Sequence, residues 1–298
     1  MTTSIPAWPD VLAQDPFPQW APAPTRPRLT EGETHVWRAD TTSAAEHLAQ
    51  SQGTTPLLSD DELARGELIS GEQQRARWLG AHALLRILLG RYLDCAPGDL
   101  QFATGEHGKP SLAPTFAPAS AEGPRARDDG ATLHFNLSHS AGTVLYAFSA
   151  DAPVGVDVEV AERERDYASI VRRVFGEGEA ERLRQLDRAT RELEFLRAWS
   201  RWEAEVKCLG TGLGWADADE VTDGRRAGTT AHAANRQALA PHAAGPIWIA
   251  ELELGPRTAG AVASLRRPEA LRCWTWDWAV APMSSAARKL RGSGPARR

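Results

Sequence analysis

The sequence predicts an α+β protein, and three patterned stretches support this fold class. VGVDVEV, at residues 154–160, alternates apolar and polar side chains, which is the period-two signature of a half-buried strand. TLHFNLSH and TVLYAFS predict two more strands that meet at a turn around residues 140–142. Large apolar residues recur every three or four positions over residues 191–209 and predict an amphipathic helix. Because helices and strands follow one another in two successive sets, we expect two similar halves that meet near residue 152.

The remaining elements follow from the same two periodicities. One long helix is predicted to place these residues on its apolar side: Trp78, Ala81, Leu85, Leu88 and Tyr92. Two loops are expected where Pro, Ala and Gly accumulate, over residues 113–130 and 223–246. Further helices are predicted around residues 167–175 and 177–186, and further strands over residues 247–254, 261–265 and 273–278.

The two ends of the chain differ in composition from its middle. Seven prolines within residues 1–29 predict an extended leader. Five basic side chains, mixed with glycine and proline, predict a disordered tail over residues 284–298. We therefore divide the chain into the leader, an N-terminal subdomain over residues 30–152, a C-terminal subdomain over residues 153–283, and the tail.

The composition favours a cytoplasmic protein over a secreted, membrane or nucleic-acid-binding one. With 298 residues, 42% of them hydrophobic, the chain is long enough to bury a substantial core. A net charge of −5 argues against wholesale binding to nucleic acid. The three cysteines are too few and too scattered for a disulfide framework or a zinc site, which fits a reducing cytosol. The first residues lack the features of a secretory signal, and no run of about eighteen apolar residues could span a membrane.

Two acids lie side by side on the predicted VGVDVEV strand. Asp157 and Glu159 share one face because they are two residues apart, whereas Val156, Val158 and Val160 point toward a core. Neighbouring carboxylates repel each other unless a cation or a proton lies between them. Mg²⁺ suits the pair, since it prefers oxygen ligands and keeps water and substrate phosphates in its shell. The pattern favours phosphoryl chemistry, although an Asp-x-Glu pair on an edge strand is also typical of a solvated surface.

A third acid lies on the predicted helix over residues 191–209. Glu203 and Lys207 are four residues apart and therefore lie one turn from each other on the same face. Such a pair is either an ordinary surface ion pair or, beside the strand acids, part of a charged site.

Two further motifs place polar side chains upstream of the acids. GKP, at residues 108–110, predicts a turn from which Lys109 can reach a phosphate, although a plain surface lysine is the alternative. The segment is no Walker A loop, because Ala103 stands where the first glycine belongs and a proline follows the lysine. In FNLSHS, Ser138 and His139 are neighbours on a strand and point to opposite faces, so they do not form a Ser–His catalytic pair.

Together these motifs resemble those of the Sfp-type 4′-phosphopantetheinyl transferases. The family has a GKP turn, an FN(L/I)SHS segment, and the signatures (V/I)G(I/V)D(I/V)E and W(S/T)xKE(A/S)xxK. GKP, FNLSHS, GVDVE and WSRWEAEVK match them here in the same order, and the resemblance spans about residues 60 to 215. It implies a pseudo-twofold monomer of two similar α/β subdomains, with the site between the halves.

The resemblance also implies an activity and its partners. A Mg²⁺-dependent enzyme of this family moves the 4′-phosphopantetheine arm of coenzyme A, its substrate, onto a serine of an acyl, peptidyl or aryl carrier protein. The other product is adenosine 3′,5′-bisphosphate. Neither nucleic acid nor a membrane is an expected partner.

The resemblance assigns roles to individual residues of this chain. The implied metal ligands are Asp157, Glu159 and Glu203, and the implied catalytic residues are Glu203 and Lys207. The implied contacts with coenzyme A are Arg77, Gly108, Lys109, Pro110, Ser138, His139 and Lys207. Either Glu203 or a metal-bound water is expected to take the proton of the carrier serine. Candidates for docking an acidic carrier are Arg163, Arg165, Arg172 and Arg173.

Two positions depart from the family pattern. Trp202 stands where relatives have a lysine immediately before the helix acid. Residues 57–77, LLSDDELARGELISGEQQRAR, are mostly acidic where relatives have several basic residues that reach the 3′-phosphate of coenzyme A. These departures motivate a rival hypothesis, a catalytically weakened homologue that binds coenzyme A or a carrier as a regulatory or scaffold subunit. A Mg²⁺-dependent phosphohydrolase that uses the same acids is a third hypothesis.

Overall fold

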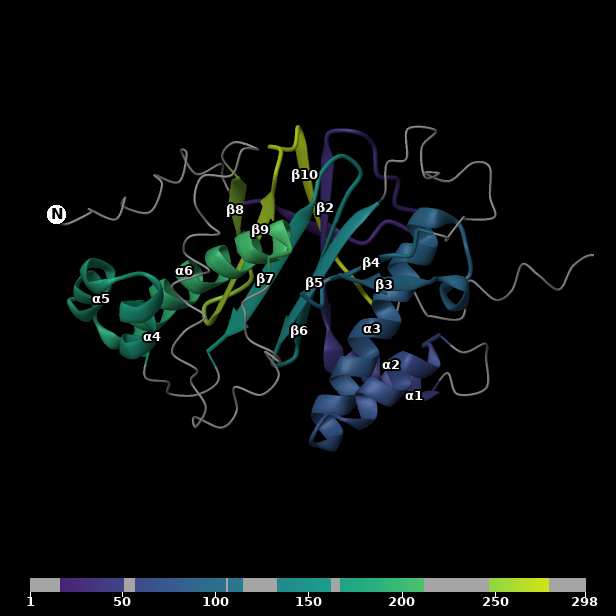
Figure 1. The fold of residues 1–298 in the computed structure, drawn as a ribbon, viewed down its shortest axis with the longest axis horizontal. Coiled ribbons are helices and arrows are strands. Elements are labelled where there is room, and N and C mark those ends of the chain that lie inside the picture. The colour runs from purple at the N-terminus through teal and green to yellow at the C-terminus, as the bar shows by residue number, and fades with distance from the viewer. Residues whose placement is uncertain are drawn as a thin grey trace, which may run out of the picture.

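Two β-sheets lie between two groups of helices in the computed structural model (Figure 1). The structure describes residues 17–50, 57–105, 107–114, 133–161, 167–211 and 247–278. The predicted tail, the predicted 223–246 loop and most of the predicted 113–130 loop and of the proline-rich leader lie outside these ranges. The mixture of helices and sheets confirms the α+β class, whereas the pseudo-twofold relation stays a prediction.

The larger sheet has five strands in the order β1-β10-β2-β6-β5. Their bounds are β1 Trp20–Pro22, β10 Ala270–Thr275, β2 Glu33–Asp40, β6 Thr143–Ser149 and β5 His134–Ser140. β5 and β6 form the predicted hairpin, in which Ser140 pairs with Thr143 and Ala141 adopts a positive φ of 53°. β10 lies between β1 and β2 and pairs in parallel with both. A strand near the C-terminal end of the described residues thus completes a sheet whose other strands come earlier in the chain.

The smaller sheet has three antiparallel strands in the order β7-β9-β8. Their bounds are β7 Val154–Val160, β9 Thr258–Ser264 and β8 Trp248–Glu253. β7 coincides with the predicted VGVDVEV strand, and the predicted boundary at residue 152 falls between β6 and β7. A separate two-stranded ribbon is formed by β3 (Phe102–Thr104) and β4 (Pro110–Leu112), on either side of the GKP turn.

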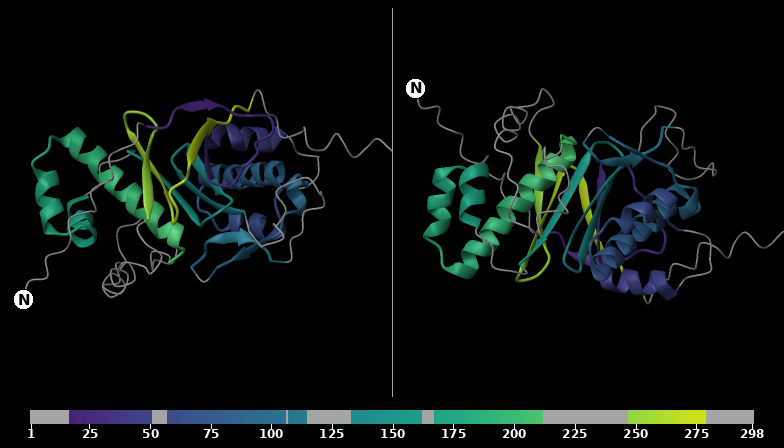
Figure 2. Two further views of the ribbon diagram at one scale, coloured as in Figure 1. Left: turned by 90° about the horizontal axis from the view of Figure 1, so that it is seen from above. Right: turned by 60° about the horizontal axis from the view of Figure 1, so that its bottom comes forward.

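The helices cover the outer faces of the two sheets (Figure 2). Before the hairpin come α1 Thr41–Gln50, α2 Asp60–Glu67, α3 Glu72–Leu93 and the 3-10 turn η1 Pro97–Asp99. After β7 come α4 Tyr167–Val174, α5 Glu177–Arg184 and α6 Arg188–Leu209. α6 begins three residues earlier than its apolar periodicity predicts, because the Asp187 side chain caps it by accepting from the amides of Ala189 and Thr190. None of the helices in the described ranges has both the length and the apolar composition to cross a bilayer.

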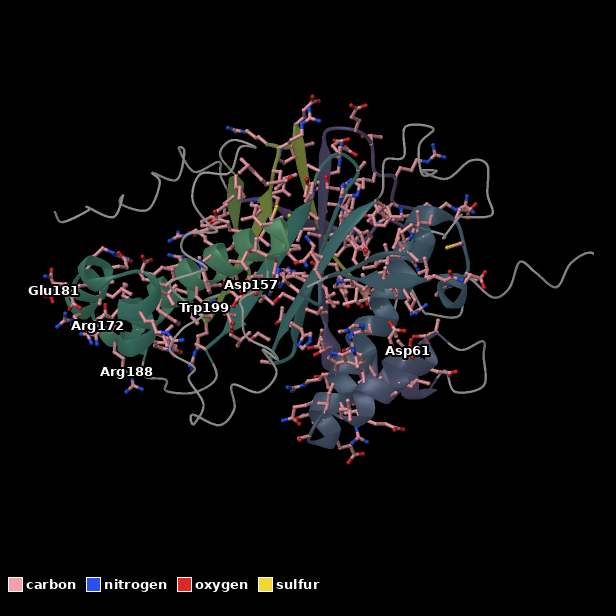
Figure 3. All side chains as sticks on the ribbon, in the orientation of Figure 1. Asp61, Asp157, Arg172, Glu181, Arg188 and Trp199 are labelled. Carbon is pink, nitrogen blue, oxygen red and sulfur yellow. The ribbon has the colours of Figure 1, made fainter. Side chains whose placement is uncertain are left out.

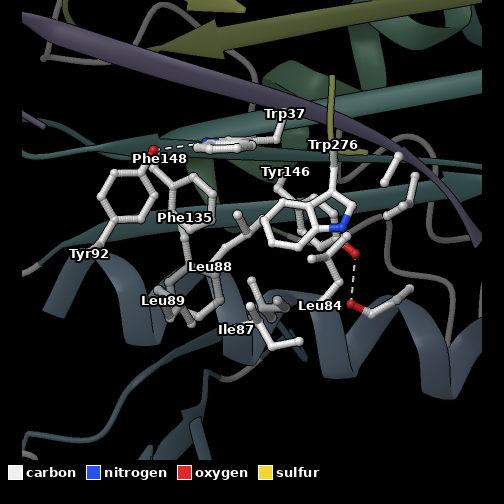
Figure 4. Close-up of a cluster of buried hydrophobic side chains, with 14 of the residues drawn as sticks. Trp37, Leu84, Ile87, Leu88, Leu89, Tyr92, Phe135, Tyr146, Phe148 and Trp276 are labelled. Carbon is white, nitrogen blue, oxygen red and sulfur yellow. Dashed lines mark hydrogen bonds between the residues drawn. The ribbon is translucent and has the colours of Figure 1, made fainter. Parts of the chain in front are cut away.

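Apolar layers hold the two sheets and the helices that cover them together, and a further cluster packs α4 and α5 against α6. On one face of the five-stranded sheet, α3 packs against large aromatic side chains such as Trp37, Tyr146 and Phe148 (Figure 4). Its other face meets the three-stranded sheet, where Val156 and Val158 lie in the same cluster as residues of β2 and β6. The outer face of the three-stranded sheet is covered by α6 through small residues of α6 and β9. β7 is therefore covered on both faces rather than half-exposed.

The acidic segment before α3 folds into a helix that the periodicity of the sequence did not predict. Ser59 and Glu62 form a capping box, in which each side chain accepts from the backbone amide of the other residue. Glu62 also accepts from Arg86 at 2.7 Å, a bond that helps to satisfy a buried guanidinium. The Ser-x-x-Glu spacing was the local signal for this helix start.

A buried polar network links β2 to α3 beneath the sheet. The Trp37 Nε1–H donates to the Tyr92 hydroxyl at 2.8 Å, and that hydroxyl lies 2.8 Å from His35 Nδ1. Because the hydroxyl already accepts from Trp37, we assign its hydrogen to His35 Nδ1, which leaves the His35 Nε2–H facing Glu33 at 3.3 Å. Burial lowers the pKa of His35 to about 4, and Glu33 opposes this shift.

We expect His35 to make the fold sensitive to acid. The folded pKa of about 4 lies below the ordinary 6.5, so its stabilising contribution is complete above pH 6.5 and is lost as the pH falls toward 4. The loss is on the order of 3 kcal/mol. Urea unfolding of the wild type and of His35→Gln at several pH values measures it. The difference in unfolding free energy between the two proteins should shrink over that interval; a constant difference would contradict the assignment.

Candidate functional site

Close contact between β7 and α6 brings the predicted catalytic motifs together. Gly155, in the middle of the GVDVE motif, allows this contact. A Cβ at that position would lie 2.0 Å from the Ala204 carbonyl oxygen and 2.3 Å from the Cys208 amide nitrogen. The helix therefore rests directly on the strand backbone, which brings α6 next to Asp157 on β7 (Figure 3).

A lysine–carboxylate cluster lies at this contact. The Lys207 ammonium donates to Asp157 Oδ1 at 2.6 Å and lies 3.8 Å from Glu203 Oε2. Ser138 on β5 donates its hydroxyl to the same Asp157 oxygen at 2.8 Å and accepts from Lys207 at 3.0 Å. Asp157 and Glu203 are 2% and 6% exposed, so this is a buried charged site rather than a solvated surface. Asp157 and Glu203 are therefore not part of a solvated surface, which was the alternative interpretation of each pair.

Burial and charge together set the protonation of the cluster. Burial raises the pKa of Glu203 to about 8; Lys207 opposes this shift, and the Asp157 and Glu159 carboxylates add to it. For Lys207, burial acts to lower the pKa, but the Asp157 and Glu203 carboxylates outweigh burial and the pKa is raised. The arrangement favours a protonated Lys207 and raises the pKa of Glu203 to slightly above neutral pH.

Side chains of alternate β5 residues accept hydrogen bonds from backbone amides of β7, on the edge of β7 that faces away from β9. Asn136 Oδ1 accepts from the Val156 amide at 2.9 Å, and Ser140 Oγ accepts from the Val160 amide at 3.1 Å. Ser140 also donates to Glu159 Oε2 at 3.2 Å. The polar positions of FNLSHS thus join the two sheets edge to edge through side chains, a role that local periodicity could not show.

Lys109 of the GKP turn contacts backbone rather than the acid cluster. Its ammonium donates to the carbonyl oxygens of Val154 at 3.1 Å, Lys207 at 2.6 Å and Cys208 at 3.3 Å. Gly108 has a φ of +81°, a conformation that favours glycine, and so shapes the turn that presents the lysine. Burial lowers the pKa of Lys109.

Arg77 and His139 lie apart from the acid cluster. His139 alternates with Ser138 along β5 and shares its strand face with Phe135 and Leu137, which pack with α3. Arg77 lies near the start of α3, and its Nε is buried with no hydrogen-bond partner in the parts of the chain that the structure describes. The two predicted nucleotide contacts therefore both belong to the α3 side of β5.

Trp202 is buried at the point where the sequence departs from the family pattern. Only 7% of its surface is exposed, and its ring lies 5.1 Å from that of Trp199. The aromatic contacts continue along α6 from Trp199 to Phe195 and from Phe195 to Tyr167 on α4. The side chain thus packs beside the cluster instead of adding a cation to it.

The predicted carrier-docking arginines have different positions. Arg163 and Arg165 lie outside the described residues. Arg172 is exposed on α4 and forms an ion pair with Glu177 at 2.6 Å. Figure 3 shows Arg172 at the far end of the α4–α5 pair from Asp157. Arg173 follows it on the same helix.

The chemistry of the cluster fits a hard cation. Asp157 Oδ2 is buried and has no hydrogen-bond partner among the described residues, so one carboxylate oxygen is left for a cation. The Asp157 and Glu159 carboxylates both add to the raised pKa of Glu203, so the three acids belong to one charged cluster. Within the described ranges no group of three acidic, histidine or cysteine side chains is arranged so that it could hold a metal ion, and the metal ligands therefore stay a prediction.

Comparisons with known proteins agree with the geometry. The family model described as the 4'-phosphopantetheinyl transferase superfamily matches residues 153–253, which include β7 and α6. The 4'-phosphopantetheinyl transferase HetI of Nostoc sp. is 32% identical over 202 residues, which cover 68% of this chain and 79% of HetI. AcpT of Salmonella typhi is 34% identical over 55% of this chain and 74% of its own length. Sfp of Bacillus subtilis is 29% identical over 46% of this chain and 53% of its own length.

These matches and the site define a class of phosphoryl-transfer enzymes. The chain belongs to the 4′-phosphopantetheinyl transferase superfamily. It is a transferase that uses coenzyme A as its substrate and acts on carrier protein domains, as the resemblance of its motifs implies.

Proposed function

We propose that this chain transfers the 4′-phosphopantetheine arm of coenzyme A to a serine of an acyl, peptidyl or aryl carrier protein in a Mg²⁺-dependent reaction. The observation that supports it most is the buried contact of Asp157, Lys207 and Glu203 between β7 and α6. This contact joins two of the four motifs that carry the family resemblance, GVDVE and WSRWEAEVK. The proposed setting is the cytoplasm, with the chain acting as a monomer and without nucleic acid or membrane partners.

Transfer forms one oxygen–phosphorus bond and breaks another. The carrier serine oxygen attacks the β-phosphorus of coenzyme A, the bond to adenosine 3′,5′-bisphosphate breaks, and the serine hydroxyl loses its proton. Glu203 is the chain's own candidate to accept that proton, because burial raises the pKa of its carboxyl to about 8 and so makes its carboxylate more basic than that of an exposed glutamate. The burial that raises this pKa also keeps bulk water from the group.

Lys207 is this chain's own cation for the charge of the pyrophosphate, and a bound metal would add to it. Lys207 offers an ammonium beside the acids, and phosphoryl transfer depends on positioning and charge stabilisation of this kind. Asp157, Glu159 and Glu203 would hold Mg²⁺, which when bound neutralises pyrophosphate oxygens. The buried Oδ2 of Asp157, which has no hydrogen-bond partner among the described residues, supports that assignment.

The nucleotide end of coenzyme A is assigned to the α3 side of β5. Arg77 and His139 belong to that side and would meet the 3′-phosphate, whereas Ser138 points to the acid cluster. Gly108, Lys109 and Pro110 form the turn beside α6. Arg172 and Arg173 on α4 are the described candidates for meeting an acidic carrier.

Release of adenosine 3′,5′-bisphosphate tests the function. The protein is incubated with coenzyme A and Mg²⁺, with and without a carrier domain, and the released nucleotide is quantified. Transferase activity predicts release only when the carrier is present. Release without carrier would indicate a phosphohydrolase instead, and no release would support the binding or scaffold role.

Substitutions of Trp202 test whether the active site has adapted to this residue or whether the chain is a catalytically weakened homologue. Because the ring is buried, we expect Trp202→Lys to lower the free energy of unfolding by about 3 kcal/mol and to leave transfer no faster. Trp202→Phe retains an aromatic ring and should cost less. Urea unfolding and transfer rates measure both effects. A stable Trp202→Lys protein with faster transfer would instead support the weakened homologue.

A further inference from the structure

Lys109 lies where the GKP turn meets the end of α6. The turn closes through a bond from the Gly105 amide to the Lys109 carbonyl at 3.0 Å, and β4 begins at the next residue, Pro110. The Lys109 side chain then crosses to α6, where its Cδ would lie 3.7 Å from a Cβ built on Gly210.

Three carbonyl oxygens account for every hydrogen that the Lys109 ammonium can donate. An ammonium has three N–H donors, and those of Lys109 reach the carbonyls of Val154, Lys207 and Cys208. Two of these carbonyls belong to the last turn of α6, and the third belongs to β7. A phosphate contact would require breaking at least one of these bonds.

The carbonyls that Lys109 satisfies are ones that the secondary structure leaves unpaired. The last four carbonyls of an α-helix have no intrahelical partner, and a cation is favoured near them by the helix dipole. In α6 the Val206 carbonyl accepts from the Gly210 amide, which leaves Lys207 and Cys208 to Lys109. The Val154 carbonyl lies on the same edge of β7 whose amides bond to Asn136 and Ser140.

Lys207 is held at both ends by this arrangement. Its backbone carbonyl accepts from Lys109, while its own ammonium donates to Asp157 on β7. A shift of the last turn of α6 relative to β7 would therefore move Lys207, and with it Glu203 one turn earlier, away from Asp157.

We propose that Lys109 is a positioning residue, which clamps the end of α6 to β7 and thereby fixes Glu203 and Lys207 against Asp157. This role rests on the proposed transferase function and replaces a direct grip on a coenzyme A phosphate. The GKP turn then acts by aligning the catalytic elements and not by increasing the affinity for the substrate.

Kinetics of Lys109→Met with a saturating carrier test the clamp. We expect kcat to fall by about 30-fold or more, since displacement of catalytic groups by about 1 Å can cost 100-fold. The KM for coenzyme A should stay within about twofold of the wild type. Lys109→Arg, which can still donate to carbonyls, should recover part of kcat. Arg28→Met removes an exposed cation between β1 and β2, far from the acid cluster, and should leave both constants unchanged.

Amide hydrogen exchange provides a readout that does not depend on activity. In Lys109→Met the amides at the end of α6, up to Gly210, should exchange about tenfold faster than in the wild type, whereas those in the first turns of α6 should not. Arg77→Ala serves as the comparison for a phosphate contact, because it should raise the KM for coenzyme A more than that for 3′-dephospho-coenzyme A.

The outcomes separate the clamp from the alternatives. A raised KM for coenzyme A with kcat retained would overturn the clamp and assign Lys109 to a phosphate. An unchanged kcat with a lower melting temperature would reduce it to a stabilising residue. If the wild type transfers nothing, the proposed function fails, and the exchange rates alone judge the clamp: unchanged rates overturn it. If Lys109→Met does not fold, Lys109→Arg and its exchange rates take its place.

Discussion

Asp157→Asn is expected to lower the rate of Mg²⁺-dependent transfer by at least about 1,000-fold. Asparagine keeps the shape of the side chain, and its amide oxygen can still accept from Ser138 and Lys207 as Oδ1 does. An amide NH₂ group then occupies the position of Oδ2, which is buried and has no partner among the described residues. That position changes from a cation ligand to a hydrogen-bond donor. The loss should therefore fall on catalysis rather than on folding.

Thermal unfolding separates these two effects. Mg²⁺ at about 100 times its dissociation constant should stabilise the wild type by about 2.7 kcal/mol, and this gain should disappear in Asp157→Asn. Asp187→Asn is the matched control, because asparagine caps a helix as well as aspartate does and Asp187 lies at the other end of α6. Near-normal turnover in Asp157→Asn would show that the strand acids are not the metal site.

Gly155→Ala is expected to disrupt both the fold and the activity. The added Cβ would lie 2.0 Å from the Ala204 carbonyl oxygen and 2.3 Å from the Cys208 amide nitrogen, which are backbone atoms of α6. Neither atom can rotate away as a flexible side chain would, so the helix must move off β7. Overpacking typically costs 1–3 kcal/mol, and we expect about 3 kcal/mol or more here.

The control for Gly155 is a glycine with open space around it. A Cβ on Gly178, within α5, would meet no atom within 4 Å, and Gly178→Ala should stabilise the protein by about 0.5–1 kcal/mol. Urea unfolding and transfer rates are measured for both variants. If Gly155→Ala folds with normal stability and turns over normally, α6 does not depend on close contact with β7.

Local periodicity was sufficient to predict the elements that form the acid cluster. The alternation in VGVDVEV defined β7, and the spacing of aromatic residues defined most of α6. The i, i+2 and i, i+4 spacings then placed Asp157 with Glu159 and Glu203 with Lys207. Periodicity could not show that α6 buries Asp157, because that depends on Gly155 and on the contact between two elements.

Long-range pairing was beyond the reach of these patterns. β10 lies beside β2 although more than two hundred residues separate them, and nothing local to either strand indicates the partner. Asn136 and Ser140 bond to β7, and Lys109 to the end of α6, through side chains whose targets appear only once the sheets are assembled. α2 is different, since its capping box was visible in the letters of residues 59–62.

The mass of a carrier domain after incubation with this protein tests the central claim most directly. An unmodified carrier is mixed with coenzyme A, Mg²⁺ and the wild-type chain, and its intact mass is recorded by mass spectrometry. A parallel sample contains a chelator, and another contains Asp157→Asn. We predict a gain of one phosphopantetheine on the carrier serine in the first sample and none in the other two. An unmodified carrier in all three samples, across acyl, peptidyl and aryl carrier domains, would contradict the assignment of this site to phosphopantetheinyl transfer.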